Sequence, residues 1–222
     1  MYQLVVFDWD GTLMDSTLKI ANCIRASAED AELPKPSVDQ AKQIIGLGLH
    51  ECMSVLFPDA TKSQRTFMVD RYKYHFVTGD GTEQSLFQGV QSGLQLLEDH
   101  GVLMAVATGK SRVGLDRAFG VTSVSDFFSI TRCADESRTK PHPQMLHDIL
   151  DFTAIDANKA IMIGDTTFDI EMAHSAGVDS LGVTYGAHDQ AKLDRYNPTH
   201  LAASVSDVFS WLSNGKLEKA YE

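Results

Sequence analysis

The stretch Leu4-Val5-Val6-Phe7-Asp8-Trp9-Asp10-Gly11-Thr12 places two acids directly after a short apolar run. Such a run, bounded by polar residues, predicts a buried strand. Gly11 lets the chain turn sharply after the acids. Two carboxylates this close repel each other, and a divalent cation such as Mg²⁺ relieves that repulsion. The alternative is a plain turn at Asp10-Gly11 that follows a solvated Asp8.

Similar apolar runs recur along the chain and alternate with helical patterns. After 4–7, the expected strands are residues 102–107, 128–131, 160–163 and 180–184. The expected helices between them are residues 90–100, 111–119, 143–152 and 168–176, and several of these should end at a glycine, as at Gly101, Gly120 and Gly177. This alternation predicts an α/β fold, a Rossmann-like three-layer core in which helices cover both faces of a parallel sheet.

Residues 15–87 interrupt this rhythm, because they contain no convincing strand. Their patterns predict helices at 17–31, 38–45, 49–56 and 63–76, with Phe67, Met68 and Phe76 as core residues. The segment is too long for a simple crossover. We therefore predict an α/β core domain formed by 1–14 and 88–222, and a helical cap domain formed by 15–87. The alternative is an extra layer on a single domain.

Other strand ends carry polar residues, and ligands of open parallel sheets bind beyond such ends. Thr108-Gly109 follows the run at 102–107 and offers a hydroxyl and a backbone N–H to a phosphate, beside the positive end of the next helix. The alternative is an ordinary helix cap by Thr108 or Ser111. Lys140, held by Pro141, offers a positive charge to a phosphate. The alternative is a surface lysine before a helix.

Asp165 and Asp169 follow the run at 160–163 and are four residues apart, so they share one face of a helical turn. They are candidates to complete a metal site begun by Asp8. The alternative is helix capping by Asp165, with Asp169 as a favourable first-turn acid. Acids, a threonine and a lysine at four strand ends are together the set that metal-assisted phosphoryl transfer requires.

Composition narrows the partners. The formal net charge of −11 over 222 residues repels nucleic acid and anionic membranes, so neither is expected as a partner. Three scattered cysteines, Cys23, Cys52 and Cys133, indicate free thiols in a reducing compartment. The N-terminus has no basic leader, and no apolar run approaches the ~18 residues of a membrane helix. A soluble cytoplasmic protein is the expectation.

The motifs resemble those of the haloacid dehalogenase (HAD) superfamily. The segment from Asp8 to Thr12 looks like its DxDGT motif, Thr108-Gly109 like the second motif, Lys140-Pro141 like the third, and Gly164-Asp165-Thr166-Thr167-Phe168-Asp169 like the fourth, GDxxxD. The helical insert resembles the cap of the subgroup that contains phosphoglycolate phosphatases and β-phosphoglucomutases. The second half of the chain looks most like the phosphoglycolate phosphatases.

This resemblance implies a Mg²⁺-dependent phosphatase that acts on a small phosphorylated metabolite, with 2-phosphoglycolate as the first candidate. It implies that Asp8 forms an aspartyl-phosphate and that Asp10 is the general acid and base. The implied metal ligands are Asp8, the backbone carbonyl of Asp10, Asp165 and Asp169, and the implied phosphate-binding residues are Thr108, Gly109 and Lys140. Residues 45–49 are either a cap loop that faces the site or a simple turn between helices.

Rival functions remain at this point. A β-phosphoglucomutase-like sugar phosphomutase has the same fold, although Thr12 favours a phosphatase, since many such mutases carry valine there. Haloacid dehalogenase activity usually goes with loss of the second acid, and Asp10 is present. A phospho-accepting receiver-type signalling domain also gathers acids, a threonine and a lysine, but in another chain order and without a helical insert. A catalytically inactive binding protein would not need the complete acid set.

Overall fold

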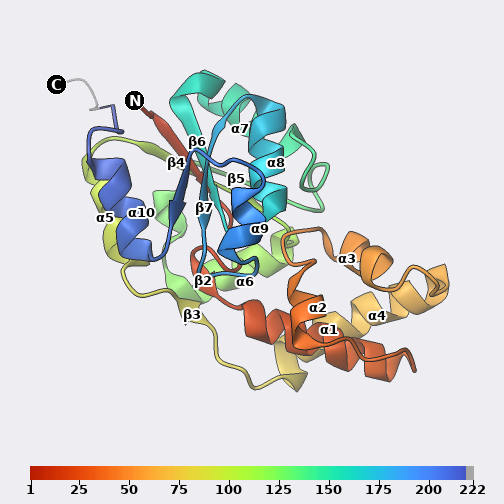
Figure 1. The fold of residues 1–222 in the computed structure, drawn as a ribbon. Coiled ribbons are helices and arrows are strands. Elements are labelled where there is room, and N and C mark those ends of the chain that lie inside the picture. The colour runs from red at the N-terminus through yellow and green to blue at the C-terminus, as the bar shows by residue number, and fades with distance from the viewer. Residues whose placement is uncertain (219–222) are drawn as a thin grey trace.

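A six-stranded parallel sheet forms the centre of the molecule (Figure 1) in this computed structural model, which describes residues 1–218. The strands lie in the order β5-β4-β1-β6-β7-β8. Their bounds are β1 (Leu4–Phe7), β4 (Leu103–Thr108), β5 (Ile130–Cys133), β6 (Ala160–Gly164), β7 (Asp179–Val183) and β8 (His200–Ala202). The predicted parallel sheet is confirmed, and the strand that precedes Asp8 lies in its interior.

Different helices bury the two faces of this sheet. In β1, Val5 and Phe7 join the apolar cluster of α5, α6 and α10, whereas Leu4 and Val6 join that of α7 and α8. Successive side chains of a strand point to opposite faces, which is why a strand buried on both sides is apolar throughout. The helices are α5 (Val90–Asp99), α6 (Arg112–Thr122), α7 (Gln144–Thr153), α8 (Thr167–Ala176) and α10 (Val205–Ser213). The predicted three-layer core is confirmed.

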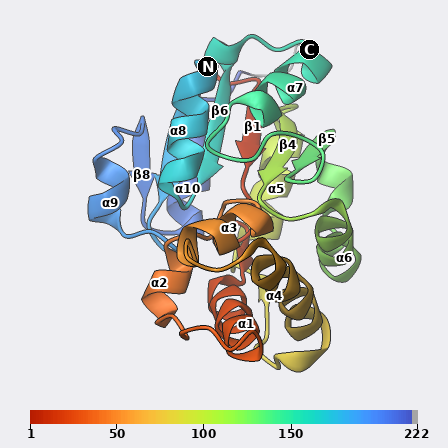
Figure 2. The ribbon, with the colours of Figure 1, turned by 90° about the vertical axis from the view of Figure 1, so that its right-hand side faces the viewer.

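The segment after β1 is helical and has an apolar cluster of its own, built around residues such as Ile24, Met53 and Met68. Figures 1 and 2 show its helices gathered beside one edge of the sheet. They are α1 (Thr17–Asp30), α2 (Val38–Lys42), α3 (Leu49–Leu56), α4 (Lys62–Tyr74) and a short π-helix, η1 (His75–Gly79). The separate cluster supports the division into 1–14 with 88–222 and 15–87, which stays a prediction.

Several predicted bounds are wrong in instructive ways. The strand expected at 128–131 is β5, which begins two residues later, because Phe128 leaves the 3₁₀ turn η2 (Ser125–Phe127) and packs its ring on Phe119 and Trp9. The helix expected to stop at Gly120 continues as α6 to Thr122 and ends at Ser123 in the left-handed conformation. The aromatic Phe128 therefore does not mark the start of β5, and Gly120 does not mark the end of α6.

Residues 15–87 were expected to hold no strand, and this is wrong at both ends of the segment. The two-residue strands β2 (Met14–Asp15) and β3 (Ser85–Leu86) pair antiparallel, Met14 with Leu86 and Asp15 with Ser85. This pairing joins the points at which the chain leaves and re-enters the sheet region. Five further elements had no prediction: β8, the 3₁₀ turns η2 and η3 (Ala157–Lys159), α9 (Gln190–Asp194) and α10.

Burial corrects one further expectation in the helical segment. Met68 is fully buried as predicted, but Phe67 is 47% exposed and Phe76 is half-buried. The three cysteines are buried free thiols, as expected. Among residues 1–218, no helix combines the length and apolar character that crossing a membrane would require.

Candidate active site

The polar side chains at the strand ends meet at one edge of the sheet. Asp8 follows β1, Thr108 ends β4 and Asp165 follows β6, and each is at most 1% exposed. Because parallel strands bring their carboxyl ends to the same edge, residues far apart in the sequence become neighbours there. Carboxylate oxygens of Asp8, Asp165 and Asp169 lie within 4.8 Å of one another. Asp8 is therefore not a solvated strand end.

Lys140 lies between two of these carboxylates. Its Nζ is 2.8 Å from Asp8 Oδ1 and 2.7 Å from Asp169 Oδ1, and its side chain is completely buried. Burial lowers the pKa of Lys140, but the attraction of Asp169 and Asp8 outweighs this effect and raises the pKa overall. The ammonium group therefore stays charged, and Lys140 is not a surface lysine.

One oxygen of Asp8 is held and the other is not. Its Oδ1 accepts a hydrogen bond of 2.6 Å from the backbone N–H of Trp9. Its Oδ2 is buried and has no hydrogen-bond partner among the described residues. Burial raises the pKa of Asp8 to about 7, against the opposing effect of Lys140 and with a contribution from Asp169. A buried oxygen left in this state is suited to contact a cation or a substrate.

Asp165 is fixed by two donors from different parts of the chain. Its Oδ2 accepts the backbone N–H of Ala187 at 2.7 Å, and its Oδ1 accepts the Thr12 hydroxyl at 3.2 Å. Burial and the nearby charges of Asp8 and Asp169 hold the pKa of Asp165 well above its usual range. Without a cation, the ionised form of this carboxylate is therefore disfavoured.

Asp169 combines a structural with a chemical position. Its Oδ2 accepts both the backbone N–H and the hydroxyl of Thr166, at 3.1 and 2.7 Å. Thr166 is the N-cap of α8, so the alternative of helix capping by Asp165 is wrong. The other oxygen of Asp169 faces Lys140. Asp169 thus stabilises the N-terminus of α8 and also contributes a charge to the acid cluster.

The charge balance of this cluster fits a divalent cation. When all three buried carboxylates are ionised, they exceed the one buried ammonium by two negative charges. Uncompensated buried charge costs several kcal/mol per ion. Carboxylate oxygens are ligands that Mg²⁺ prefers, and the unpartnered Oδ2 of Asp8 gives such an ion a natural contact. The carboxylate of Asp10 is not part of this group, so its expected part in metal binding rests on its backbone carbonyl.

Asp10 has a separate set of partners. Its Oδ1 accepts the Ser16 hydroxyl at 2.6 Å, and Lys110 Nζ is 2.9 Å from both carboxylate oxygens. The Lys110 ammonium also lies over the ring of Phe76, 4.9 Å from its centre. No motif in the sequence pointed to Ser16. The position of Lys110, directly after the Thr108-Gly109 motif, was the available signal.

Thr108 and Gly109 line the same cavity as Asp8 and Asp10. Ser111, whose hydroxyl accepts the Gly114 N–H at 3.3 Å, caps α6, so Thr108 does not serve as the cap. A Cβ on Gly109 would lie 2.6 Å from the carbonyl oxygens of Gly46 and Leu47, which leaves no room for a side chain. The loop at 45–49 therefore packs directly against the Thr108-Gly109 segment.

A cavity of about 650 Å³ lies between the helical segment and the carboxyl ends of the strands, where the acids lie. Asp8 and Asp10 line it on one side, and residues 45–49 line it on the other. Of the two alternatives for residues 45–49, the structure therefore favours the loop that faces the site. A further tie is the hydrogen bond from the Thr139 hydroxyl to the Glu51 carboxylate, which connects α3 to the residue before Lys140.

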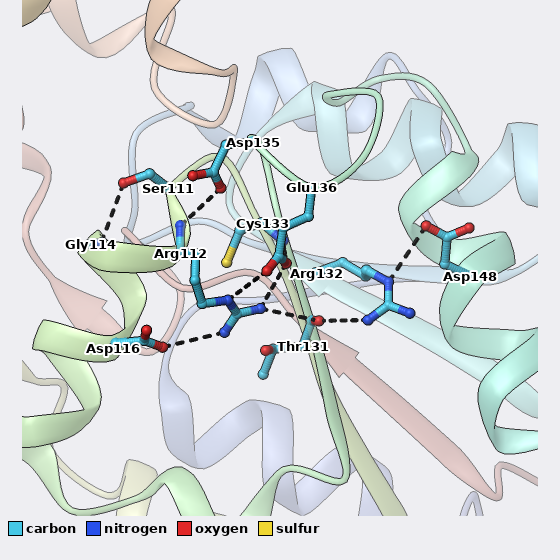
Figure 3. A network of polar contacts seen from close by, with 10 residues as sticks. All are labelled: Ser111, Arg112, Gly114, Asp116, Thr131, Arg132, Cys133, Asp135, Glu136 and Asp148. Atoms are coloured by element: carbon cyan, nitrogen blue, oxygen red, sulfur yellow. Dashed lines mark hydrogen bonds and ion pairs between the residues drawn. The ribbon is translucent and has the colours of Figure 1, made fainter.

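A polar network on the surface anchors the loop that leads to Lys140 (Figure 3). Arg112 forms two contacts of 2.7 Å with the Glu136 carboxylate, and its backbone N–H donates to Asp135 at 2.9 Å. Glu136 also accepts the backbone N–H of Cys133 at 3.1 Å. The Arg112 guanidinium holds the pKa of Glu136 below its usual value. These contacts fix the start of the loop to α6, and the sequence analysis did not anticipate them.

The fold and the site together define a class: α/β enzymes with a Rossmann-like sheet, an acid cluster at the end of the first strand and a helical insertion behind it. The model of one family, described as haloacid dehalogenase-like hydrolase, matches residues 5–183. The chain belongs to this family, and the resemblance drawn from the four motifs is confirmed.

Several relatives match nearly the whole chain. "Probable phosphatase IndB" of Dickeya dadantii (strain 3937) is 31% identical over 217 residues, which are 94% of this chain and 92% of the relative. A phosphoglycolate phosphatase of Aliivibrio fischeri (strain ATCC 700601 / ES114) is 27% identical over 223 residues, 95% of this chain and 94% of the relative. The predicted enzyme class, a hydrolase of this superfamily that resembles phosphoglycolate phosphatases, is confirmed.

Solved structures show the same fold. The crystal structure of a haloacid dehalogenase-like hydrolase from Bacteroides fragilis superimposes with a TM-score of 0.86 and 24% identity, and the match covers 94% of this chain and all of that one. At this identity the likeness establishes the fold alone. It includes the helical segment as well as the sheet, because the match extends over nearly the whole chain.

Proposed function

We propose that this chain is a Mg²⁺-dependent phosphatase that hydrolyses a small phosphorylated metabolite through an aspartyl-phosphate on Asp8. One observation carries the proposal: the Asp8 carboxylate is buried at the cavity wall beside Lys140 and two further acids, and its Oδ2 has no hydrogen-bond partner in the described chain. Carboxylates act as nucleophiles in phosphoryl transfer when their surroundings are arranged in this way.

In the first step, a carboxylate oxygen of Asp8 attacks the phosphorus of the ester. A bond forms from phosphorus to Asp8, and the bond from phosphorus to the leaving oxygen breaks. Protonated Asp10 gives its proton to that oxygen, so the substrate's alcohol departs. In the second step, water attacks the phosphorus, Asp10 takes a proton from it, and the bond to Asp8 breaks to release inorganic phosphate.

The partners of Asp10 suit the second step. The Ser16 hydroxyl and the Lys110 ammonium hold its carboxylate in a fixed position. The ionised form is the one that accepts a proton from water. Lys110 is therefore a positioning residue that acts through Asp10.

The remaining residues hold the phosphoryl group. The Thr108 hydroxyl, the Gly109 N–H and the Lys140 ammonium are assigned to its oxygens, where charge develops during transfer. Asp8, the Asp10 carbonyl, Asp165 and Asp169 are assigned to Mg²⁺. When bound, the metal supplies positive charge that screens the acids from the incoming phosphate and stabilises the transferring group.

The names of the relatives make 2-phosphoglycolate the reference substrate for this proposal. A sugar phosphomutase of the same fold would return the phosphoryl group to the sugar instead of to water. The receiver-type alternative is wrong for this chain, because the chain belongs to a hydrolase family and carries α1 to α4 after its first strand.

The test is steady-state phosphate release by the purified chain with Mg²⁺, from p-nitrophenyl phosphate and from 2-phosphoglycolate. Release that requires both Mg²⁺ and Asp8 is expected, together with mass-spectrometric capture of phosphate on Asp8 in a rapidly quenched reaction. Isomerisation of a hexose phosphate without phosphate release would favour the mutase. Absence of turnover with every ester would contradict the proposal.

A further inference from the structure

The cavity is far larger than a phosphoryl group needs. Its volume of about 650 Å³ has room for roughly 20 water molecules at about 30 Å³ each. The acids and the phosphate-binding motif occupy only one wall. The opposite wall comes from the helical segment, and it faces whatever remains of the substrate beyond its phosphate.

That opposite wall is apolar and aromatic. It contains Ile20 and Ile24 of α1, Val69 and Tyr72 of α4, and Phe76 of η1. The rings of Tyr72 and Phe76 stack with centres 5.7 Å apart and planes 28° apart, and both residues contribute to the apolar surface of the cavity. A flat apolar group gains both from burial and from stacking on such a surface.

The aromatic wall reaches the reacting end of the cavity. Phe76 lies under the ammonium of Lys110, which in turn holds Asp10, the residue assigned to the leaving oxygen. Burial raises the pKa of the Tyr72 hydroxyl well above its usual value, with a smaller contribution from Asp10, and both residues line the cavity. A leaving group released beside Asp10 therefore meets the two rings directly.

The apolar wall has no unpaired buried cation for a substrate carboxylate among the described lining residues. Lys110 is engaged by Asp10, and the other lysine and arginine side chains among the described lining residues, Lys73 and Arg117, are exposed. A carboxylate moved from water onto this wall would lose solvation without gaining a buried cation. The geometry disfavours 2-phosphoglycolate, whose leaving group is a short carboxylic acid.

On the basis of the proposed phosphatase function, we propose that the preferred substrate is a phosphate monoester whose leaving group presents a flat, largely apolar or aromatic face to Tyr72 and Phe76. The substrate class is then set by the stacked pair at the junction of α4 and η1. The acids at the strand ends perform the same chemistry whatever the ester.

The experiment compares kcat/KM with Mg²⁺ for 2-phenylethyl phosphate, ethyl phosphate and 2-phosphoglycolate. The first two are esters of primary alcohols and differ chiefly by the ring. We expect 2-phenylethyl phosphate to exceed ethyl phosphate by about tenfold or more, the scale on which apolar pockets discriminate. We also expect it to exceed 2-phosphoglycolate.

Two substitutions test whether Tyr72 and Phe76 cause the preference for an aromatic leaving group. Tyr72→Leu and Phe76→Leu should each lower the ratio of kcat/KM for 2-phenylethyl phosphate to that for ethyl phosphate by about fivefold, the effect of losing one aromatic contact. The ratio is independent of the fraction of enzyme that is correctly folded. The matched control is Phe67→Leu, an exposed aromatic on the same helix, which should leave the ratio unchanged.

The outcomes separate the two proposals. If ethyl phosphate is hydrolysed but the ring brings no preference, or both leucine variants keep the wild-type ratio, the substrate inference is overturned and the phosphatase function stands. A clear preference for 2-phosphoglycolate overturns the inference in the same way. If none of the three esters is hydrolysed although p-nitrophenyl phosphate is, only the substrate inference is overturned. If p-nitrophenyl phosphate is not hydrolysed with Mg²⁺ either, the phosphatase function itself falls, and the inference falls with it.

Discussion

The two walls of the cavity differ in almost every physical respect. On the sheet side, Asp8 lines the cavity, and Lys140 and Asp169 lie behind it; all three are at most 1% exposed and are joined by ion pairs of 2.7 to 2.8 Å. On the helical side, Tyr72 and Phe76 are half-buried, and they present ring surfaces in place of charges. The first wall is specified by charge neutralisation and the second by shape and apolar area.

This difference shows how one site can keep its chemistry while its substrate changes. Removing a member of the charged wall leaves a buried charge uncompensated, which costs several kcal/mol. Changing a side chain of the apolar wall costs far less and mainly alters what fits. We therefore expect substitutions on the sheet side to affect every substrate, and substitutions on the helical side to affect substrates unequally.

The strongest test of the charged wall is Asp8→Asn. The amide cannot attack phosphorus, so kcat should fall by roughly 10³-fold or more with every ester, as in other enzymes that lose a nucleophile. Turnover of p-nitrophenyl phosphate measures it, and circular dichroism checks the fold. Asp15→Asn, which changes an exposed acid of the same segment, is the control and should keep wild-type activity. Activity near wild type in Asp8→Asn would remove Asp8 from its proposed role.

Metal removal tests whether the excess negative charge of this wall is balanced by a cation. EDTA should abolish turnover and Mg²⁺ should restore it. Without substrate, Mg²⁺ at about 100 times its Kd should stabilise the fold by about 2.7 kcal/mol, which thermal unfolding detects as a higher Tm. In Asp165→Asn this increase should be lost. Metal-independent turnover by the wild-type chain would show that the cluster balances its charge in another way.

Lys140→Ala tests the charge that both ion pairs share. We expect kcat/KM to fall by about 10²-fold, because the ammonium is assigned to the transferring phosphoryl oxygens. The loss should be similar for 2-phenylethyl phosphate and ethyl phosphate, since it lies on the sheet side. An unchanged kcat/KM would show that Lys140 only neutralises its neighbours.

Lys110 lies where the two walls touch, so it sharpens the comparison. Lys110→Met keeps the length of the side chain but removes the ammonium group that holds Asp10, and we expect kcat to fall about tenfold as the general base loses its position. Its effect on the ratio between the two alkyl esters should be small. A change confined to KM would instead place Lys110 among the substrate-binding residues.

The smallest effect on activity is expected from loss of the hydrogen bond that connects the two walls. Thr139→Val removes the hydroxyl that donates to Glu51 on α3. An exposed hydrogen bond contributes about 1 kcal/mol, so we expect KM to rise by a few-fold with little change in kcat. Glu51→Gln, which can still accept a hydrogen bond, should behave nearly as wild type. A large loss of kcat in Thr139→Val would mean that this contact positions Lys140.

The charged wall could be predicted from the sequence because its members follow apolar runs whose strand character is plain. Asp8, Thr108 and Asp165 are tied to strands, and parallel strands end at one edge. Lys140 could be placed there only by its motif, since the loop before it is held by Arg112 and Glu136 through contacts of high sequence separation. Such contacts leave no local pattern.

The apolar wall could not be predicted in the same way. Phe67, Met68 and Phe76 share a helical spacing, yet Phe67 is exposed, Met68 is buried and Phe76 faces the cavity. Periodicity identifies an apolar face but not what that face meets. The donors to Asp165 and Asp10, from Ala187 and Lys110, likewise depend on how distant segments pack.

The paired strands β2 and β3 have a mechanical consequence. The outgoing and returning strands of the helical segment are stitched side by side, Met14 to Leu86 and Asp15 to Ser85. A helical segment attached through this one short strand pair can rotate about it but cannot shift along it, because such a shift would break the register of both strands at once. Each rotation would then return the Tyr72 and Phe76 rings to the same position over the acids.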